Sequence, residues 1–168
     1  IFNNEISYIS EAIKKNELAT GKYIIKFENE IKKFTKSKYS LSCINGTAAL
    51  HLSLKVLGIK KGDEVIVPTL TFVATINSVI YNQATPLFMD SDEYFNINEE
   101  KTIDFINKNT FFKNNITYNK KSRKKIFAII VTHVWGNAAS IEKLVSLCRK
   151  RNIKIIEDAS ESLGTKYI

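Results

Sequence analysis

Hydrophobic and polar positions along this chain of 168 residues follow two different periods. Apolar side chains that recur every three or four residues predict helices, and short apolar runs predict strands. The predicted helices span residues 7–15, 23–34, 47–57, 72–81, 99–108 and 141–150. The predicted strands span residues 39–44, 64–67, 85–89, 126–131 and 153–156. Strands and helices therefore alternate over most of the chain.

The clearest signal lies in the last third of the chain. IFAIIV at residues 126–131 is a continuous apolar run, as expected of a strand that is buried on both faces. An amphipathic helix follows it, and then a second apolar run, IKII, at residues 153–156. Strand, helix and strand at this spacing form a unit with two parallel strands. We therefore predict the α/β class, with a mainly parallel sheet flanked by helices.

The sequence also predicts which side chains of one helix, and which cysteines, are buried. In the helix over residues 47–57, we expect Ala48, Leu52, Val56 and their neighbours to point inward. The chain has two cysteines, Cys43 and Cys148, which are too few for a disulfide framework. Both lie in apolar surroundings, so we expect them to be inert core residues of a protein in the reducing cytoplasm.

Composition excludes some classes of protein. An apolar content of 44% fits a globular protein. No apolar run reaches the roughly 18 residues that cross a bilayer. The first ten residues, IFNNEISYIS, lack the basic and then apolar order of a secretory signal. We therefore expect no membrane among the partners of this protein.

The formal net charge of +8 raises the alternative of nucleic-acid binding. Basic residues gather at residues 32–38 and 113–125, and the second segment reads KNNITYNKKSRKK. That segment is rich in Asn and Lys and contains no recognisable nucleic-acid motif. We interpret it as a solvated surface insertion and expect no nucleic acid as a partner.

Polar and aromatic residues follow several of the predicted strands. They are Asn45-Gly46-Thr47, the TLTF segment after Pro68, the segment at residues 132–136, and Asp158. Ligands of open parallel sheets bind outside the carboxyl ends of the strands. These separated segments therefore predict one ligand site at one edge of the sheet.

The stretch CINGTAAL, residues 43–50, has the features of an anion site at the start of a helix. Free backbone N–H groups and a partial positive charge point out of a helix N-terminus. Gly46 would let the backbone approach a phosphate closely, and Thr47 offers a hydroxyl group. The spacing is neither that of a P-loop nor that of a dinucleotide-binding fingerprint. An ordinary helix N-cap explains the same residues equally well.

Asp158 follows a predicted strand, and a carboxylate in that position, beside apolar walls, needs a cationic partner. The protonated ring nitrogen of pyridoxal phosphate is such a partner, and this cofactor carries its phosphate at the opposite end of a flat ring. Phe72 could stack on that ring. Taken alone, an Asp that caps the next turn and a Phe in the core explain these two residues as well.

Four segments, taken in order, carry a resemblance to a known family. They read NGTAAL, GDEVIVPTLTFVAT, VTHVWGN and IIEDASESLG, and LATGKYIIKFENEI precedes them. In this order they resemble the DegT/DnrJ/StrS family of sugar-nucleotide aminotransferases that depend on pyridoxal phosphate. The resemblance covers nearly the whole chain and is weakest between residues 92 and 125. It implies part of the large domain of the type I aminotransferase fold, and a homodimer with active sites at the subunit interface.

The resemblance also implies roles for single residues of this chain. Thr47 and Ala48 would hold the phosphate, and Gly46 would shape the turn. Phe72 would stack on the pyridine ring, and Asp158 would pair with its nitrogen. One more position, Glu161, stands where the family usually has Gln, near the ring hydroxyl.

Three further residues are expected near the substrate. Thr20 and Gly21 would shape the substrate entrance. His133 falls at the histidine position that follows a strand in the family, and a hydrogen-bonded structural histidine is the alternative interpretation. The substrates that the resemblance implies are a nucleotide-linked keto-hexose and an amino-acid donor, glutamate, used in the synthesis of bacterial surface amino sugars.

An aminotransferase of this kind needs a lysine that binds the cofactor covalently. Lys166 lies too close to Asp158 for that role, so we expect the lysine beyond Ile168. We accordingly expect residues 1–168 to be a single incomplete domain, the amino-terminal part of the large domain of a longer enzyme, and to be inactive alone.

Three alternatives remain open at this point. Some relatives of this fold replace the lysine with His and remove water from the sugar. A truncated homologue without catalysis could bind a partner subunit. The basic segment at residues 113–125 could bind nucleic acid.

Overall fold

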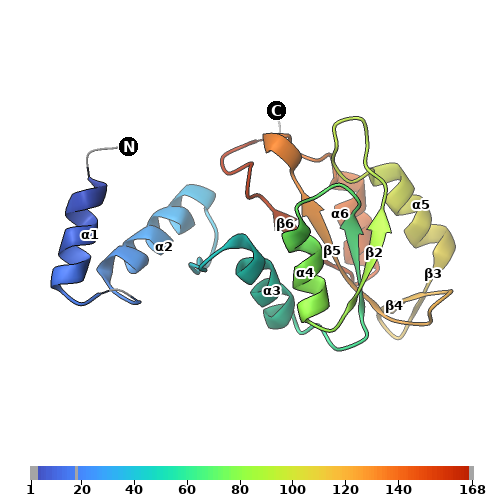
Figure 1. Ribbon diagram of the computed structural model, residues 1–168. Helices are drawn as coiled ribbons and strands as arrows, with labels where there is room; N and C mark the ends of the chain where they lie inside the picture. Colours follow the sequence, from blue (N-terminus) through green and yellow to red (C-terminus); the bar gives the residue numbers. More distant parts are fainter. Residues whose placement is uncertain (1–3, 18, 167–168) are drawn as a thin grey trace. The chain divides into compact units, whose positions relative to one another are not determined.

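The computed structural model describes residues 4–17 and 19–166 of the chain (Figure 1). It contains two compact units, residues 1–44 and residues 45–168. Our expectation of a single incomplete domain stays a prediction. Leu18, the first residue of the LATGKYIIKFENEI segment, lies outside the described residues.

The first unit contains two helices, α1 (Glu5–Lys14) and α2 (Lys22–Thr35). The carboxylate of Glu11 on α1 accepts hydrogen bonds from the side chains of Lys22 and Tyr23 on α2. These hydrogen bonds, chiefly the one from Lys22, lower the pKa of Glu11 to about 2. Neither helix has a buried residue among those described. These hydrogen bonds and a contact between the rings of Tyr8 and Tyr23, whose centroids are 5.0 Å apart, join the two helices.

Two expectations in the first unit are wrong. Residues 39–44, predicted as a strand, are irregular, and Cys43, predicted in the core, is exposed. A strand needs a neighbouring strand for its N–H and C=O groups. Ser42 instead donates its backbone N–H and its hydroxyl to the carboxylate of Glu28, each at 2.8 Å. The N–H and hydroxyl groups of Ser42 thus have a partner without a sheet.

The second unit is built on a four-stranded parallel sheet, as the sequence predicts. Its strands are β1 (Glu64–Pro68), β2 (Thr85–Met89), β5 (Ile126–Thr132) and β6 (Lys154–Asp158), in the spatial order β2-β1-β5-β6. All three neighbouring pairs are parallel, so the carboxyl ends of the strands share one edge.

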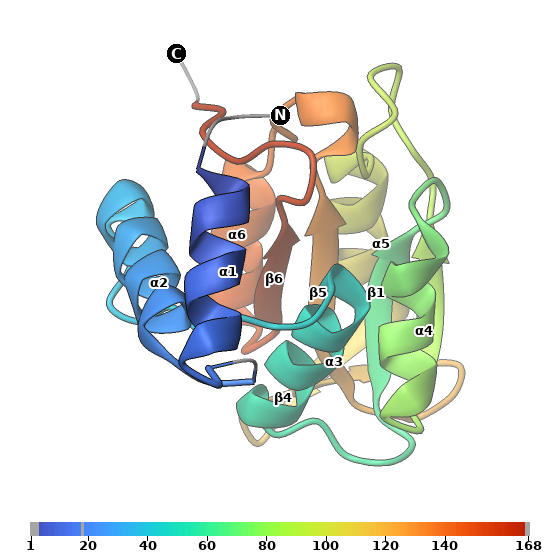
Figure 2. The same cartoon turned by 60° about the vertical axis from the view of Figure 1, so that its left-hand side comes forward.

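Helices cover both faces of this sheet. Figure 2 shows α3 (Gly46–Leu57) and α4 (Val73–Tyr81) in front of it, and α5 (Glu99–Asn109) and α6 (Glu142–Lys150) behind it. A short 3-10 turn, η1 (Val134–Gly136), follows β5. None of the described helices is long and apolar enough to cross a membrane.

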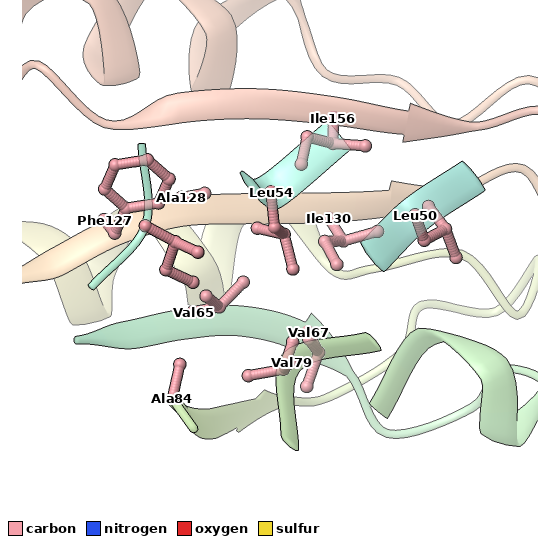
Figure 3. Packing of buried hydrophobic residues seen from close by; sticks show 11 residues of the cluster. Leu50, Leu54, Val65, Val67, Val79, Ala84, Phe127, Ala128, Ile130 and Ile156 are labelled. Atoms are coloured by element: carbon pink, nitrogen blue, oxygen red, sulfur yellow. The ribbon is translucent and has the colours of Figure 1, made fainter. Parts of the chain in front are cut away.

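Alternate residues of the central strands point to two separate cores. Val65 and Val67 of β1 pack with Leu54 of α3 and Val79 of α4 on one face (Figure 3). Ile66, between them in the sequence, belongs to the cluster with α5 and α6 on the other face. Strands that are buried on both faces explain the continuous apolar runs in the sequence. Cys148 lies in the second core, as expected.

The predicted inner face of α3 is wrong. Val56, expected inside, is 77% exposed, whereas Leu50 and Leu54 are buried. The helix reads GTAALHLSLKVL and is apolar on nearly every side, so its periodicity does not define one face. Packing against β1 and β5 makes the choice instead.

The basic segment is only partly the solvated insertion that the sequence suggests. Its first half joins an antiparallel hairpin, β3 (Thr110–Lys113) and β4 (Ile116–Asn119). Asn114 and Asn115 form its two-residue turn with φ values of 52° and 60°, the conformation of a type I′ turn. Thr117 is buried and donates its hydroxyl to the carbonyl of Arg151 at 2.6 Å. The hairpin is therefore anchored to the rest of the second unit.

A buried hydrogen bond between the hairpin and the sheet gives a stability prediction. Asn119 donates its side-chain N–H to Oε2 of Glu64 at 2.9 Å, and both residues are buried. Asn119→Ala removes this donor, so we predict a loss of about 2 kcal/mol in the free energy of unfolding, measured by urea denaturation. The exposed neighbour Lys121 provides the control, because Lys121→Ala should change the free energy of unfolding by less than about 0.5 kcal/mol. Equal values for the two variants would contradict the anchoring role of Asn119.

Candidate functional site

A cavity of about 510 Å³ lies at the edge of the sheet where the strands end. β1 has β2 on one side and β5 on the other, so the order of strand addition reverses between β1 and β5. Ligands of open α/β sheets bind at such a reversal, outside the carboxyl ends of the strands. The volume lies within the range of small-molecule pockets, about 300–1,000 Å³. The cavity is lined by residues 45–47 and 50 of α3 and its cap, 70–72 and 74 after β1, 132, 134 and 135 around the end of β5, and 158, 160 and 161 around the end of β6.

The cavity brings together most of the residues that the sequence predicts for the cofactor. Residues from α3, from the start of α4, and from the end of β6 line it, namely Gly46, Thr47, Phe72, Asp158 and Glu161. These positions lie up to 115 residues apart in the sequence, and the parallel sheet places them around one cavity. Ala48 is not part of the lining.

The N-terminus of α3 forms one wall. The helix begins at Gly46, one residue before the predicted start, and Asn45 is its N-cap. Oδ1 of Asn45 accepts the N–H of Ala48 at 2.8 Å, so this amide already has a partner. The N–H groups of Gly46 and Thr47 have no acceptor within the helix, because first-turn amides lack one. With the helix dipole, they favour an anion at this wall.

Gly46 faces the loop after β6 across a short distance. A Cβ atom at this position would lie 3.6 Å from Oγ of Ser160, which is an ordinary van der Waals contact. The backbone there has an ordinary helical conformation. Neither packing nor backbone geometry of the described residues therefore demands a glycine at this position, and its lack of a side chain leaves room for a ligand to approach the backbone.

Asp158 ends β6 and forms the opposite polar wall. It is 9% exposed, and its Oδ1 accepts the N–H and the hydroxyl of Ser160 at 3.2 and 2.6 Å. Both hydrogen bonds of this side chain among the described residues reach Oδ1, so Oδ2 can serve a ligand. Phe72, the N-cap of α4, is 77% exposed and lines the same cavity. An aromatic ring and a fixed carboxyl group are thus available together.

Glu161 holds the loop after β5 in an uncommon shape. Its Oε2 accepts the N–H of Trp135 at 2.8 Å. Trp135 has φ 52° and ψ 30°, a left-handed conformation that costs a bulky residue about 1–3 kcal/mol. Gly136 follows with φ 82°, and a Cβ atom there would approach the carbonyl oxygen of Glu161 to 3.2 Å. The two loops therefore lie close together, and their contacts stabilise the strained backbone.

His133 follows β5 and is not part of the cavity lining. Its buried ring accepts the N–H of Ala139 at Nδ1, at 3.0 Å, and Nε2 lies 3.0 Å from Oε2 of Glu157. Because Nδ1 accepts, the neutral ring carries its proton on Nε2 and donates it to Glu157. This hydrogen bond holds the pKa of Glu157 below its ordinary value. Both ring nitrogens are thus used within the protein, which favours the structural alternative.

The roles predicted for single residues stay predictions, including those of the residues that line the cavity. The roles of Thr20 and Gly21 at a substrate entrance concern the first unit, and that of His133 concerns a residue outside the cavity lining. Among residues 4–17 and 19–166, no group of three or more His, Cys, Asp or Glu side chains is placed to hold a metal ion.

Several residues of the cavity received no individual role from the sequence, although Thr71, Thr132 and Trp135 lie in segments predicted to border a ligand site. Thr71 Oγ1 lies 3.1 Å from Thr132 Oγ1, and this contact joins the loop after β1 to the end of β5. Ser160 fixes Asp158, and Trp135 lines the cavity. The Asp-x-Ser pattern after a strand was a readable signal for Ser160, since a serine two residues on can bond the carboxylate. The conformation of Trp135 has no comparable signal.

Two helix caps with the same side-chain hydrogen bond give a matched prediction. Asn45 Oδ1 accepts the N–H of Ala48 at 2.8 Å at the start of α3, and Asn98 Oδ1 accepts the N–H of Lys101 at 2.9 Å at the start of α5. We predict that Asn45→Ala and Asn98→Ala each lower the free energy of unfolding by about 1 kcal/mol, measured by denaturant unfolding. Asn→Asp at either position should retain most of the stability that the cap contributes. A cap at Asn45 that contributes nothing would contradict the described helix start.

The sequence is similar to those of known proteins over nearly its whole length. The sequence is 38% identical over 164 residues to GDP-perosamine synthase of Escherichia coli O157:H7, covering 97% of this chain and 41% of that protein. It is 35% identical to GDP-perosamine synthase of Vibrio cholerae, covering 96% and 40%. The chain thus spans about 40% of the length of these curated relatives.

Solved structures show the same fold. An aminotransferase from Psychrobacter cryohalolentis matches with a TM-score of 0.82 and 31% identity, over 99% of this chain and 39% of that one. A DegT DnrJ EryC1 StrS aminotransferase from Brucella abortus matches with a TM-score of 0.84 and 30% identity, over 95% and 40%. The sequence pattern of one family matches all of residues 1–168. The chain belongs to the DegT/DnrJ/EryC1/StrS aminotransferase family.

Proposed function

We propose that this chain supplies the cofactor-binding walls of an aminotransferase that uses pyridoxal phosphate to transfer an amino group to a nucleotide-linked keto-hexose. Its relatives at 38% and 35% identity are named GDP-perosamine synthases, which supports a nucleotide-linked sugar as the substrate. Because the chain spans about 40% of their length, the proposal concerns the activity of the whole protein.

The observation that carries the proposal is the placement of Thr47 and Asp158 on one cavity. Pyridoxal phosphate carries a dianionic phosphate at one end of a flat ring and a basic nitrogen at the other. The first turn of α3 suits the phosphate, and the carboxyl group of Asp158 suits the nitrogen. The exposed ring of Phe72 lies in the same lining and suits the ring face. The residues present therefore fit this group.

Each residue of the cavity would have a separate role toward the bound cofactor. Pyridoxal phosphate, when bound, supplies a ring that accepts the negative charge developing on the reacting carbon. Asp158 holds a proton at the ring nitrogen, and the two hydrogen bonds from Ser160 keep the carboxyl group in place. The N–H groups of Gly46 and Thr47 bind the phosphate, and Phe72 excludes water from one face of the ring. Glu161 would lie near the ring hydroxyl while it holds the Trp135 loop.

The proposal includes groups that the described residues do not supply. None of the described residues that line the cavity is a lysine. We place the lysine that binds the cofactor covalently beyond Ile168, take glutamate as the amino donor, and take a homodimer as the active form. A dehydratase of this fold would differ at the lysine position, so the reaction product distinguishes the two enzymes.

The function is tested with the whole protein, pyridoxal phosphate, glutamate and a GDP-linked 4-keto-hexose. The proposal predicts equal amounts of 2-oxoglutarate and of a sugar nucleotide that carries a new amino group, measured by mass spectrometry. Loss of water from the sugar without a new amino group would identify a dehydratase. Cofactor binding without turnover would identify a non-catalytic homologue.

Asp158→Asn tests the role of the strand-end carboxyl group in the whole protein. The amide cannot hold the ring nitrogen protonated, so we predict a fall of at least about 100-fold in kcat, with unchanged circular dichroism. Asp104→Asn is the matched control, because Asp104 is exposed on α5 and pairs with Lys108. An Asp158→Asn enzyme as fast as the Asp104→Asn enzyme would remove the assignment.

A further inference from the structure

An exposed pair of aromatic rings lies beside the cavity and has no role in the proposed cofactor site. Trp135 lines the cavity and is 65% exposed. Its ring packs edge-on against Phe95, with ring centroids 4.9 Å apart and an interplanar angle of 65°. Figure 1 shows the two segments, the orange turn after β5 and the yellow-green loop between β2 and α5, at the edge of the sheet where the strands end.

Both residues have backbone conformations that bulky side chains rarely adopt. Phe95 has φ 67° and Trp135 has φ 52°. Elsewhere in the described ranges, the non-glycine residues with positive φ are Asn, Lys, Gln or Arg. Strain of this kind is retained where the surrounding structure enforces it, and it is concentrated at functional sites. The pair is therefore a candidate for a binding role.

Hydrogen bonds hold the two aromatic segments together from behind. The buried side chain of Asn96 accepts the N–H of Val134 at 3.0 Å and donates to the carbonyl of Asn137 at 3.4 Å. Each bond involves a residue next to, or close to, one of the two aromatic residues. Glu161 fixes the N–H of Trp135 as well. The pair is thus preorganised, although the indole ring faces outward.

The loop that carries Phe95 is also ordered internally. Oδ1 of Asp92 accepts the N–H groups of Tyr94 and Asn96 at 2.9 and 3.0 Å. The backbone N–H of Asp92 closes the loop by donating to the carbonyl of Asn96 at 2.8 Å. This turn places Phe95 against Trp135, while Tyr94, 62% exposed, has no ring contact in the described structure.

We propose that Trp135, supported by Phe95, is the platform on which the hexose ring of the sugar substrate stacks. This inference rests on the proposed function. The keto carbon of the hexose must reach the cofactor, so the hexose, and not the distant nucleotide, is the part of the substrate beside the cavity lining. A pyranose ring presents a face of C–H groups, and the electron-rich face of an indole attracts such weakly positive groups. A neutral aromatic platform suits a neutral sugar ring.

Binding is tested first without chemistry. Trp135 is the one tryptophan of residues 1–168, so the difference between the wild type and Trp135→Phe isolates its fluorescence in the whole protein. GDP-mannose, which has no keto group, should quench this fluorescence, and GDP alone should leave it nearly unchanged. Equal quenching by GDP would assign the platform to the nucleotide and overturn the proposal. An indole already shielded from acrylamide before ligand is added would show that another part of the protein covers it, which overturns the proposal as well.

Kinetics then separate the platform from the cofactor site. For Trp135→Ala we predict a rise of about tenfold or more in KM for the keto-sugar nucleotide, with partial recovery in Trp135→Phe and a smaller rise in Phe95→Ala. The rate at which glutamate alone converts the bound cofactor should not change. Tyr94→Ala is the matched control and should behave as the wild type. If glutamate does not convert the cofactor in the wild type, the proposed function fails; if it does and Trp135→Ala keeps a normal KM, only the platform proposal fails.

Discussion

The reversal of strand order between β1 and β5 is the constraint on which the site depends. Parallel strands need crossover connections, and these connections are right-handed. Building the sheet outward from β1 in both directions therefore sends α4 to one face and α5 to the other. The cavity lies at the ends of β1 and β5, where this reversal occurs, and residues that follow both strands line it. The parallel register then brings the end of β6 beside the end of β5, with Asp158 opposite Thr132.

The cavity walls combine groups that the core holds rigidly. Leu50 and Leu54 anchor α3 against β1 and β5, which fixes the position of the first-turn amides of that helix. Ser160 fixes Asp158, and Glu161 fixes the strained loop of Trp135. These polar contacts involve residues next to one another after β6. A short segment thus positions the carboxyl group and also holds the neighbouring loop, which links the proposed cofactor site to the aromatic pair.

The sequence predicted the parts of the fold whose signals are local. IFAIIV and the strand before Pro68 were readable because burial on both faces leaves a continuous apolar run. The inner face of α3 was not predictable, because apolar residues surround the helix. Residues 39–44 have the apolar pattern of a strand, but they have no partner strand. The ordered motifs predict a common site for Gly46, Phe72 and Asp158, and all three line one cavity. The contact of Phe95 with Trp135 joins two loops 40 residues apart and depends on two uncommon backbone conformations, so no pattern in the sequence could indicate it.

We propose that one cavity binds both ends of one flat cofactor, with its phosphate at α3 and its ring nitrogen at β6. A crystal structure of the whole protein with pyridoxal phosphate provides the test. We predict phosphate oxygens about 3 Å from the backbone nitrogens of Gly46 and Thr47, and the ring nitrogen at a similar distance from the carboxyl group of Asp158. A cofactor bound outside this cavity, or bound there with its phosphate near Asp158, would contradict it.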